Sequence, residues 1–325
     1  MAHKLVCLGE ILIDFLPIEQ DGDVQGFTMH PGGGPLNVAV GLARRGPPTA
    51  FVGKISTDYF GRRLRRAVRA EGIDDRWLFD TAAPSTLAFV AVENGEPAFT
   101  FYGDGTADTR LTRNELPSDL FAQATLLHFG GISLLRGSTP DAALAAAERL
   151  QGRVLISLDP NIRPHLVRDG MAYTATLSRA VATCDLLKLS AADVAWLAPN
   201  VDPLAFAEGQ LAVGPALVLL TRGADGVTAF RQRRDVIERI DVPSFPVTVA
   251  DTVGAGDSFS AGLLAALAAE GVFSRPALEA LASEPLRAAI RQGAATAALS
   301  CARPGANPPR SAELADFLAS HAQGL

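Results

Sequence analysis

The feature that most limits the fold is a regular alternation of short apolar runs with helical patterns along most of the 325 residues. Short apolar runs bounded by turn residues predict buried strands, and longer segments with apolar residues every three or four positions predict helices. The predicted strands are residues 4–8, 50–55, 125–129, 154–158, 186–189 and 216–220. The predicted helices are residues 35–43, 60–70, 141–150, 171–183, 204–211, 257–270 and 278–299. This alternation predicts an α/β fold with a doubly wound, mostly parallel sheet covered on both faces.

Two stretches interrupt the alternation. Residues 10–27 follow the first strand without a helix, and residues 85–92 and 96–102 alternate apolar and polar side chains around the turn Glu93-Asn94-Gly95-Glu96. An Asn-Gly pair between alternating segments predicts a β-hairpin. Together the two stretches predict a small antiparallel sheet that projects from the main domain. No change of composition marks a linker, so we expect a single domain over residues 1–325.

Composition and charge narrow the choice of partner and compartment. The formal net charge is −6, which argues against nucleic acid or an anionic membrane as the main partner. Cys7, Cys184 and Cys301 are far apart, and no CxxC pair is present, as in a reducing cytoplasm. The most apolar helical run, residues 261–269, is too short to cross a bilayer. We therefore expect a soluble cytoplasmic protein.

The most informative motif is Asp-Thr-Val-Gly-Ala-Gly-Asp-Ser-Phe-Ser-Ala-Gly, residues 251–262. It follows a β-rich segment, residues 247–249, and opens an apolar helix. A glycine-rich turn at a helix N-terminus presents unpaired N–H groups to an anion. Asp257 would repel that anion, so its carboxylate needs another reason to be there. Taking the proton from a hydroxyl that attacks a phosphoryl group is such a reason, and the motif predicts phosphoryl transfer.

Two other kinds of nucleotide-binding site are also built on glycine turns, the dinucleotide-binding turn and the P-loop. A dinucleotide-binding turn needs a G-x-G-x-x-G fingerprint after the first strand, and Leu8-Gly9-Glu10-Ile11-Leu12 does not supply one. No G-x-x-x-x-G-K-[ST] loop is present either, which excludes a P-loop kinase at the level of motifs. An ordinary glycine turn remains the alternative.

A second polar cluster is predicted near the N-terminus. Gly32, Gly33 and Gly34 allow close approach to a ligand, and Asn37 falls in the first turn of the helix that follows. Asp14 interrupts an apolar run, where a carboxylate is costly unless it is exposed or paired. Both motifs suit the binding of sugar hydroxyls. The alternatives are a capped loop for the glycines and a solvent-facing strand residue for Asp14.

Two polar segments follow predicted strands. Asp159-Pro160-Asn161-Ile162-Arg163-Pro164 comes after residues 154–158, and Thr221-Arg222-Gly223-Ala224-Asp225-Gly226 comes after residues 216–220. Ligands of open α/β sheets lie beyond the carboxyl ends of strands, so both segments are candidates for a site. The alternatives are a Pro-containing turn and a tight hairpin into residues 227–230.

Taken together, these motifs resemble those of the ribokinase (PfkB) family of carbohydrate kinases over nearly the whole chain. The glycine-rich signature is residues 32–37 and the catalytic signature is residues 251–262, in the family's order and separation. The segments that look most like fructokinases are Cys7-Leu8-Gly9-Glu10, Phe101-Tyr102, Ala107-Asp108, His128–Leu134 and Asp159-Pro160-Asn161.

The resemblance implies roles for named residues. Asp257 would be the catalytic base, and the N–H groups of Gly254, Ala255 and Gly256 would form an anion hole for the transferring phosphoryl group. The residues that would hold the sugar are Asp14, Gly33, Gly34, Asn37 and Arg163. The residues that would line the ATP site are Thr221, Gly223, Gly226, Gly305 and Ala306.

The resemblance also implies metal ions, a lid and a dimer. The family's magnesium-linked Asn-x-x-Glu motif reads Ser190-Ala191-Ala192-Asp193 here, so Asp193 would reach Mg²⁺ through water. Asp251 and the carbonyl of Val253 match positions that bind a monovalent cation such as K⁺. The small sheet, at about residues 10–33 and 85–108, would be the family's lid, through which we expect a homodimer.

The expected reaction is ATP-dependent transfer of the γ-phosphate to a primary hydroxyl, turning D-fructose into fructose 6-phosphate. One departure concerns the substrate, because fructokinases often carry Arg after the lid Phe-Tyr and this chain has Gly103. The alternatives are a 2-keto-3-deoxygluconate kinase, a ribose or nucleoside kinase, and a non-catalytic sugar-sensing protein that retains the fold.

Overall fold

The main sheet of the computed structural model has the predicted doubly wound form. The structure describes residues 3–20, 23–93, 96–233 and 236–321. Within them, nine strands form the sheet in the order β13-β12-β11-β10-β9-β8-β1-β4-β5. In this order, all neighbouring strands from β11 through β10, β9, β8, β1 and β4 to β5 pair in parallel. β12 and β13 pair antiparallel and form one edge of the sheet. The strands are β1 (Lys4–Leu8), β4 (Thr49–Ser56), β5 (Asp74–Thr81), β8 (Ala124–Gly130), β9 (Leu155–Asp159), β10 (Leu186–Ser190), β11 (Leu217–Thr221), β12 (Val227–Arg233) and β13 (Val236–Val242).

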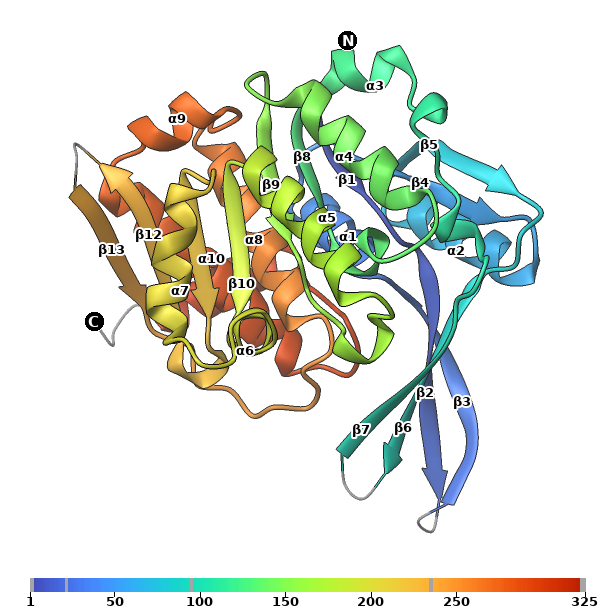
Figure 1. The fold of residues 1–325 in the computed structure, drawn as a ribbon. Coiled ribbons are helices and arrows are strands. Elements are labelled where there is room, and N and C mark those ends of the chain that lie inside the picture. The colour runs from blue at the N-terminus through green and yellow to red at the C-terminus, as the bar shows by residue number, and fades with distance from the viewer. Residues whose placement is uncertain (1–2, 21–22, 94–95, 234–235, 322–325) are drawn as a thin grey trace.

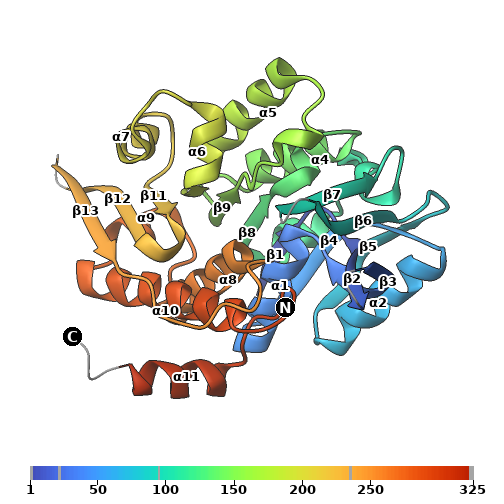
Figure 2. The ribbon, with the colours of Figure 1, turned by 90° about the horizontal axis from the view of Figure 1, so that it is seen from below.

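Helices cover both faces of this sheet (Figures 1 and 2). α1, α8 and α10 pack on one face, and α4, α5, α6 and α7 lie on the other. Strand residues alternate between the two resulting apolar cores, as Leu186 and Leu187 do on β10. The helices are α1 (Gly34–Arg45), α2 (Tyr59–Ala70), α3 (Ser118–Gln123), α4 (Thr139–Leu150), α5 (Gly170–Thr183), α6 (Ala191–Leu197), α7 (Pro203–Gly209), α8 (Ala255–Ala269), α9 (Arg275–Ala280), α10 (Ser283–Cys301) and α11 (Ser311–Ser320).

The lid projects from one end of the main sheet (Figure 1). Its strands are β2 (Leu12–Gln20), β3 (Asp23–Gly32), β6 (Thr86–Glu93) and β7 (Glu96–Tyr102), in the order β3-β2-β6-β7. Both hairpins are antiparallel as predicted, although the turn residues Asn94 and Gly95 lie outside the described residues.

The prediction of a purely antiparallel lid is wrong at its centre, because β2 and β6 pair in parallel. β2 follows β1, and β6 follows β5. β1 and β5 run in the same direction within the main sheet. Each hairpin therefore leaves the body with its first strand pointing the same way.

Two other local predictions are corrected. The predicted helix over residues 278–299 is broken, because α9 ends at Ala280 and α10 begins at Ser283, with Ala282 extended at φ −66° and ψ 159°. The break lets both Leu278 and Leu286 reach one core. Residues 247–249 form no strand. Prolines at 243 and 246 in the same segment lack the N–H that a ladder needs.

A helix that crosses a membrane must be both long enough and apolar enough to span the bilayer. Among the described residues, no helix meets both conditions.

Candidate active site

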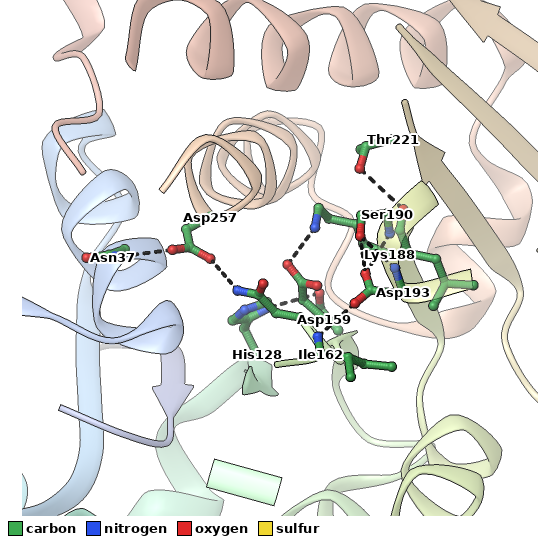
Figure 3. Close-up of polar contacts among 12 residues, drawn as sticks. Asn37, His128, Asp159, Ile162, Lys188, Ser190, Asp193, Thr221 and Asp257 are labelled. Carbon is green, nitrogen blue, oxygen red and sulfur yellow. Dashed lines mark hydrogen bonds and ion pairs between the residues drawn. The ribbon is translucent and has the colours of Figure 1, made fainter. Parts of the chain in front are cut away.

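Asp257 lies in the first turn of α8, at the centre of the candidate site. Its side chain is buried, with 6% exposed. Asn37 of α1 donates a hydrogen bond to one carboxylate oxygen at 2.8 Å, and Asn161, after β9, donates to the other at 3.3 Å (Figure 3). Two amides from distant segments thus orient one carboxylate, and the predicted base and sugar-binding Asn37 are in direct contact.

The turn before Asp257 requires glycine. Gly254 has φ +71°, in the left-handed region, and a Cβ there would lie 2.5 Å from the Cβ of Ala306. The Ala255 amide donates to the carbonyl of Thr252 at 3.2 Å. Among the described residues, the Gly254 and Gly256 amides have no acceptor. Of the three predicted anion-hole donors, Gly254 and Gly256 are therefore free to bind a ligand and Ala255 is already engaged.

The pKa of Asp257 is raised to about 6, chiefly because the carboxyl is buried. The hydrogen bond from Asn37 lowers this pKa, whereas the charge of Asp159 raises it. Lys188 and Arg163 favour the ionised form and lower it. A base with this pKa is largely ionised at pH 7 and loses its function when the pH falls below 6.

The glycine loop before α1 is held by Glu10, which sequence reasoning left without a role. The Gly34 amide donates to Glu10 Oε1 at 3.0 Å, and the Ser133 amide donates to Oε2 at 3.1 Å. Gly33 has φ +112°, and a Cβ there would lie 2.6 Å from the Glu10 carbonyl oxygen. Burial raises the pKa of Glu10 to about 7. The signal in the sequence was a carboxylate placed directly after an apolar strand.

Asp14 approaches the Asp257 carboxylate from the lid. It pairs in register with Ala88, which pairs with Phe101, so these side chains share the face of the lid opposite Phe15. The pKa of Asp14 is raised to about 7 by burial and by the charge of Asp257, and Arg163 opposes the rise. Asp14 is thus a partly buried carboxylate within electrostatic reach of the base, which does not fit the alternative of a solvent-facing residue.

Asn161 is the second residue that sequence reasoning missed, although the Asp-Pro-Asn segment was singled out. Its backbone has φ +43°, a conformation that asparagine tolerates better than most residues. Its Oδ1 accepts a hydrogen bond from Arg163 at 2.6 Å, and its Nδ2 donates to Asp257. Arg163 therefore acts on the base through Asn161, while its own side chain is largely exposed.

A cleft of about 580 Å³ lies on the other side of the first turn of α8. Its volume suits a nucleotide. Thr221, Gly223 and Gly226, which were predicted to bind the nucleotide, line this cleft beside Ala255 and Gly256. Much of the remaining wall is apolar and is made by Phe245, Val247, Val249, Phe259, Ala294, Ala297, Ala298 and Cys301.

The other two residues predicted for the nucleotide lie next to this cleft rather than in its wall. The Gly305 amide donates to Asp251 Oδ2 at 2.8 Å, and Ala306 packs against Gly254. The Val253 amide donates to Asp251 Oδ1 at 2.9 Å. Asp251 thus joins two loops, and its second predicted role, in binding a monovalent cation together with the Val253 carbonyl, stays a prediction.

The predicted magnesium residue, Asp193, already has protein partners. Its oxygens accept hydrogen bonds from the Ile162 amide at 2.7 Å, the Ser190 amide at 2.7 Å and the Ser190 hydroxyl at 2.6 Å (Figure 3). In the described part of the chain, no group of three or more His, Cys, Asp or Glu residues could hold a metal ion. Magnesium that is bound mainly by phosphates needs only one or two carboxylates, so the water-mediated role of Asp193 stays a prediction.

A buried carboxylate at a helix N-terminus, with a nucleotide-sized cleft on one side and the polar side chains of Asp14, Asn37 and Asn161 on the other, is the arrangement expected of a phosphotransferase that acts on an alcohol. The profile of the pfkB family of carbohydrate kinases matches residues 2–313. The chain therefore belongs to this family, which confirms the resemblance, the fold class and the class of enzyme.

Named relatives agree with this assignment. A fructokinase from Rhizobium leguminosarum bv. trifolii is 38% identical over 283 residues, which are 87% of this chain and 85% of that protein. The crystal structure of a fructokinase from Xylella fastidiosa with bound ATP is 29% identical, with a TM-score of 0.90 over 99% of this chain and 100% of that one. A double mutant of a fructokinase from Vibrio cholerae O395, in a form with fructose, ADP and potassium ion bound, is 28% identical, with a TM-score of 0.84 over 97% and 98% of the two chains.

Proposed function

We propose that the protein is an ATP-dependent fructokinase that converts D-fructose into fructose 6-phosphate. The observation that carries the proposal is the place of Asp257, between the nucleotide-sized cleft and the polar side chains of Asp14, Asn37 and Asn161. The names of the relatives supply the choice of fructose among sugars.

The proposed mechanism assigns a task to each group. Asp14, Gly33, Gly34 and Asn37 hold the sugar so that its primary hydroxyl meets Asp257. The hydroxyl oxygen attacks the γ-phosphorus of ATP in line, the bond to the β–γ bridging oxygen breaks, and ADP leaves with that electron pair. Asp257 takes the hydroxyl proton as the new bond forms.

The backbone and the ions supply the electrostatics in this proposal. The amides at the start of α8 face the negative charge on the transferring group. Bound Mg²⁺ would neutralise phosphate charge, with Asp193 as its protein contact through water, and K⁺ would bind at Asp251 and the Val253 carbonyl. The expected setting is the cytoplasm, in keeping with three free cysteines, of which Cys7 and Cys184 are buried.

The outer face of the lid supports a homodimer. Phe15 stacks on Phe89 with ring centroids 4.4 Å apart, and Phe27 meets Phe89 edge-on at 5.2 Å. On this aromatic face, Tyr102 is 62% exposed and Phe27 is 39% exposed. An exposed apolar sheet face of this kind is typical of an association surface. Sedimentation velocity of the wild type against Phe27→Ser tests the dimer, which the substitution should weaken.

A second candidate substrate, 2-keto-3-deoxygluconate, is favoured by one observation. The Arg136 guanidinium lies where a side chain on Gly103 would be, and its Nη2 is buried with no partner among the described residues. The chain thus places a cation beside the lid, although residue 103 itself has no side chain. Such a cation could pair with the carboxylate of a keto-acid.

A substrate panel tests both candidates. ADP release is measured with ATP, Mg²⁺ and K⁺ for fructose, 2-keto-3-deoxygluconate, glucose, ribose and adenosine, with Asp257→Asn as the blank. Turnover on fructose far above the others supports the proposal. A preference for the keto-acid that Arg136→Met abolishes would move the assignment to the second candidate. ATP binding without turnover of any acceptor would contradict both candidates and favour a sugar-sensing protein.

A further inference from the structure

Lys188 is a buried cation at the centre of the site to which the mechanism above gives no task. It lies on β10 with 4% of its surface exposed. Its ammonium group donates a hydrogen bond to Asp159 Oδ2 at 2.7 Å, from the neighbouring strand β9 (Figure 3). Leu187 and Leu189 point to the core under α5 and α6, so strand alternation directs Lys188 to the opposite face, where α8 begins.

The ammonium group lies against the anion hole. A Cβ added to Gly256 would be 3.1 Å from Lys188 Nζ and 3.6 Å from its Cε. The Gly256 amide, like that of Gly254, is a predicted anion-hole donor that has no acceptor among the described residues. An ammonium group has three N–H donors, and the hydrogen bond to Asp159 is the one that the described part of the chain gives it. The positive charge is therefore fixed beside the backbone of Gly256.

The charges around Lys188 keep it protonated. Burial by itself lowers the pKa of Lys188, but Asp159, Asp193 and Asp257 more than offset this, and the pKa is raised overall. His128 makes a hydrogen bond with Ser157 at 3.1 Å and lies within electrostatic reach of Lys188. Burial and the charge of Lys188 lower the pKa of His128 to about 3, so this histidine is neutral and adds no second cation.

The charges that face Asp257 come from several elements. Asp14 is on β2, Asp159 ends β9, Lys188 is on β10 and Arg163 follows β9. Asn37 of α1 and Asn161 are the uncharged groups in contact with the carboxylate. Lys188 is the buried cation of this set, since the Arg163 side chain is largely exposed. Because solvent screens a buried charge least, Lys188 is the cation with the strongest expected influence on the site.

We propose that Lys188 is a buried counter-cation of the phosphoryl-transfer site, whose ammonium group, fixed by Asp159 against Gly256, adds positive charge behind the anion hole and beside Asp257. It is a positioning residue that acts through the first turn of α8. The charge is in place before the reaction, so it favours the negative charge on the phosphoryl oxygens without reorganisation. Asp159 fixes the position of the ammonium group, and Asp159 Oδ1 has no partner of its own among the described residues.

The two halves of the ion pair make opposite predictions. At low pH, kcat/KM for fructose should fall as Asp257 becomes protonated, and we call this part of the pH profile the acid limb. Lys188→Met removes the cation, so the acid limb should move to higher pH. Asp159→Asn removes the anion, so the acid limb should move to lower pH. Lys188→Met should also lower kcat by about 10- to 100-fold with little change in KM. This loss is smaller than that caused by removing a direct oxyanion donor, because Lys188 acts through the first turn of α8 and does not contact the phosphoryl group itself. If the ion pair had a merely structural role, both variants would lose activity at every pH, and the acid limb would not shift in either of them.

The double variant Lys188→Met/Asp159→Asn guards against failure to fold, because it leaves neither buried ion unpaired. It should retain the loss in kcat. Lys54→Met is the matched control, since Lys54 forms a partly buried ion pair with Glu115 away from the site, and it should keep both the wild-type kcat and the wild-type acid limb. A folded double variant with wild-type kcat, or two single variants whose acid limbs coincide with the wild type, would overturn the proposal. The inference rests on the proposed kinase activity, which wild-type turnover tests by itself; the variants are then compared on whichever sugar the wild type phosphorylates.

Discussion

The two sides of Asp257 are made of different kinds of residue. On the proposed sugar side, side-chain hydrogen bonds from Asn37 and Asn161 hold Asp257, and Asp14 of β2 lies within electrostatic reach. The pKa values of Asp14, Asp257 and the nearby Glu10 are all raised toward neutrality. On the proposed nucleotide side, the cleft is lined mostly by glycines and apolar residues, and no charged side chain is among its lining residues in the described part of the chain. Substitutions on the sugar side should therefore change pH dependence, whereas those on the nucleotide side should act through shape.

The largest effect is expected at Asp257 itself, where the two sides meet. Asp257→Asn removes the base, and general-base assistance is typically worth about 10²–10⁴ in rate. We expect kcat to fall by at least that factor while fructose and ATP still bind, as measured by calorimetry. Near-normal turnover in this variant would refute the role of Asp257.

Gly254→Ala should be the next most damaging change, and it should act through shape. A side chain at φ +71° is strained by about 1–3 kcal/mol, and its Cβ would collide with Ala306. We expect a lower melting temperature, together with a loss of kcat because the first turn of α8 shifts. Gly152→Ala is the matched control, because Gly152 has φ +74° but open space around it, so it should lower stability and spare kcat. Equal kinetic effects of the two variants would contradict the steric argument.

The acid limb of the pH profile should sharpen the comparison further. The base must be ionised, and with its pKa raised to about 6 the activity should rise through that pH and level off above it. Asn37→Ala removes a hydrogen bond that favours the ionised form, so the limb should move to higher pH. The limb belongs to a coupled pair of carboxylates, since burial and the charge of Asp257 raise the pKa of Asp14 to about 7. A limb that stays in place in Asn37→Ala would show that this hydrogen bond does not tune the base.

The sequence predicted the parts of this site whose signals are local. The strand–helix alternation located six strands of the main sheet to within about two residues, and the motif of residues 251–262 identified the turn that carries Asp257. β5 was missed because Asp74, Asp75, Arg76 and Asp80 hide the pattern of this edge strand. The break at Ala282 was missed because the apolar spacing continues through it.

Contacts between distant segments gave no such signal. Glu10, Asn161 and Lys188 each act on groups 24 to 123 residues away along the chain. Each stands in a segment that a strand or a proline turn explains without function. Their roles follow from parallel strands that end at one edge of the sheet beside the start of α8, a relation that local patterns do not contain.

The smallest effect is expected at Cys301, in the wall of the nucleotide cleft. This half-buried thiol lines the cleft with small apolar neighbours, and burial raises its pKa, so it is a neutral contact rather than a charged one. Cys301→Ser keeps the shape and changes one atom, so KM for ATP should change by about threefold or less, as expected for a loss below about 0.7 kcal/mol. KM for fructose and the acid limb should not move, as steady-state kinetics at several pH values would show. A shift of the acid limb in this variant would break the division between the two sides, because a neutral substitution across α8 would then be felt by the carboxylates of the sugar pocket.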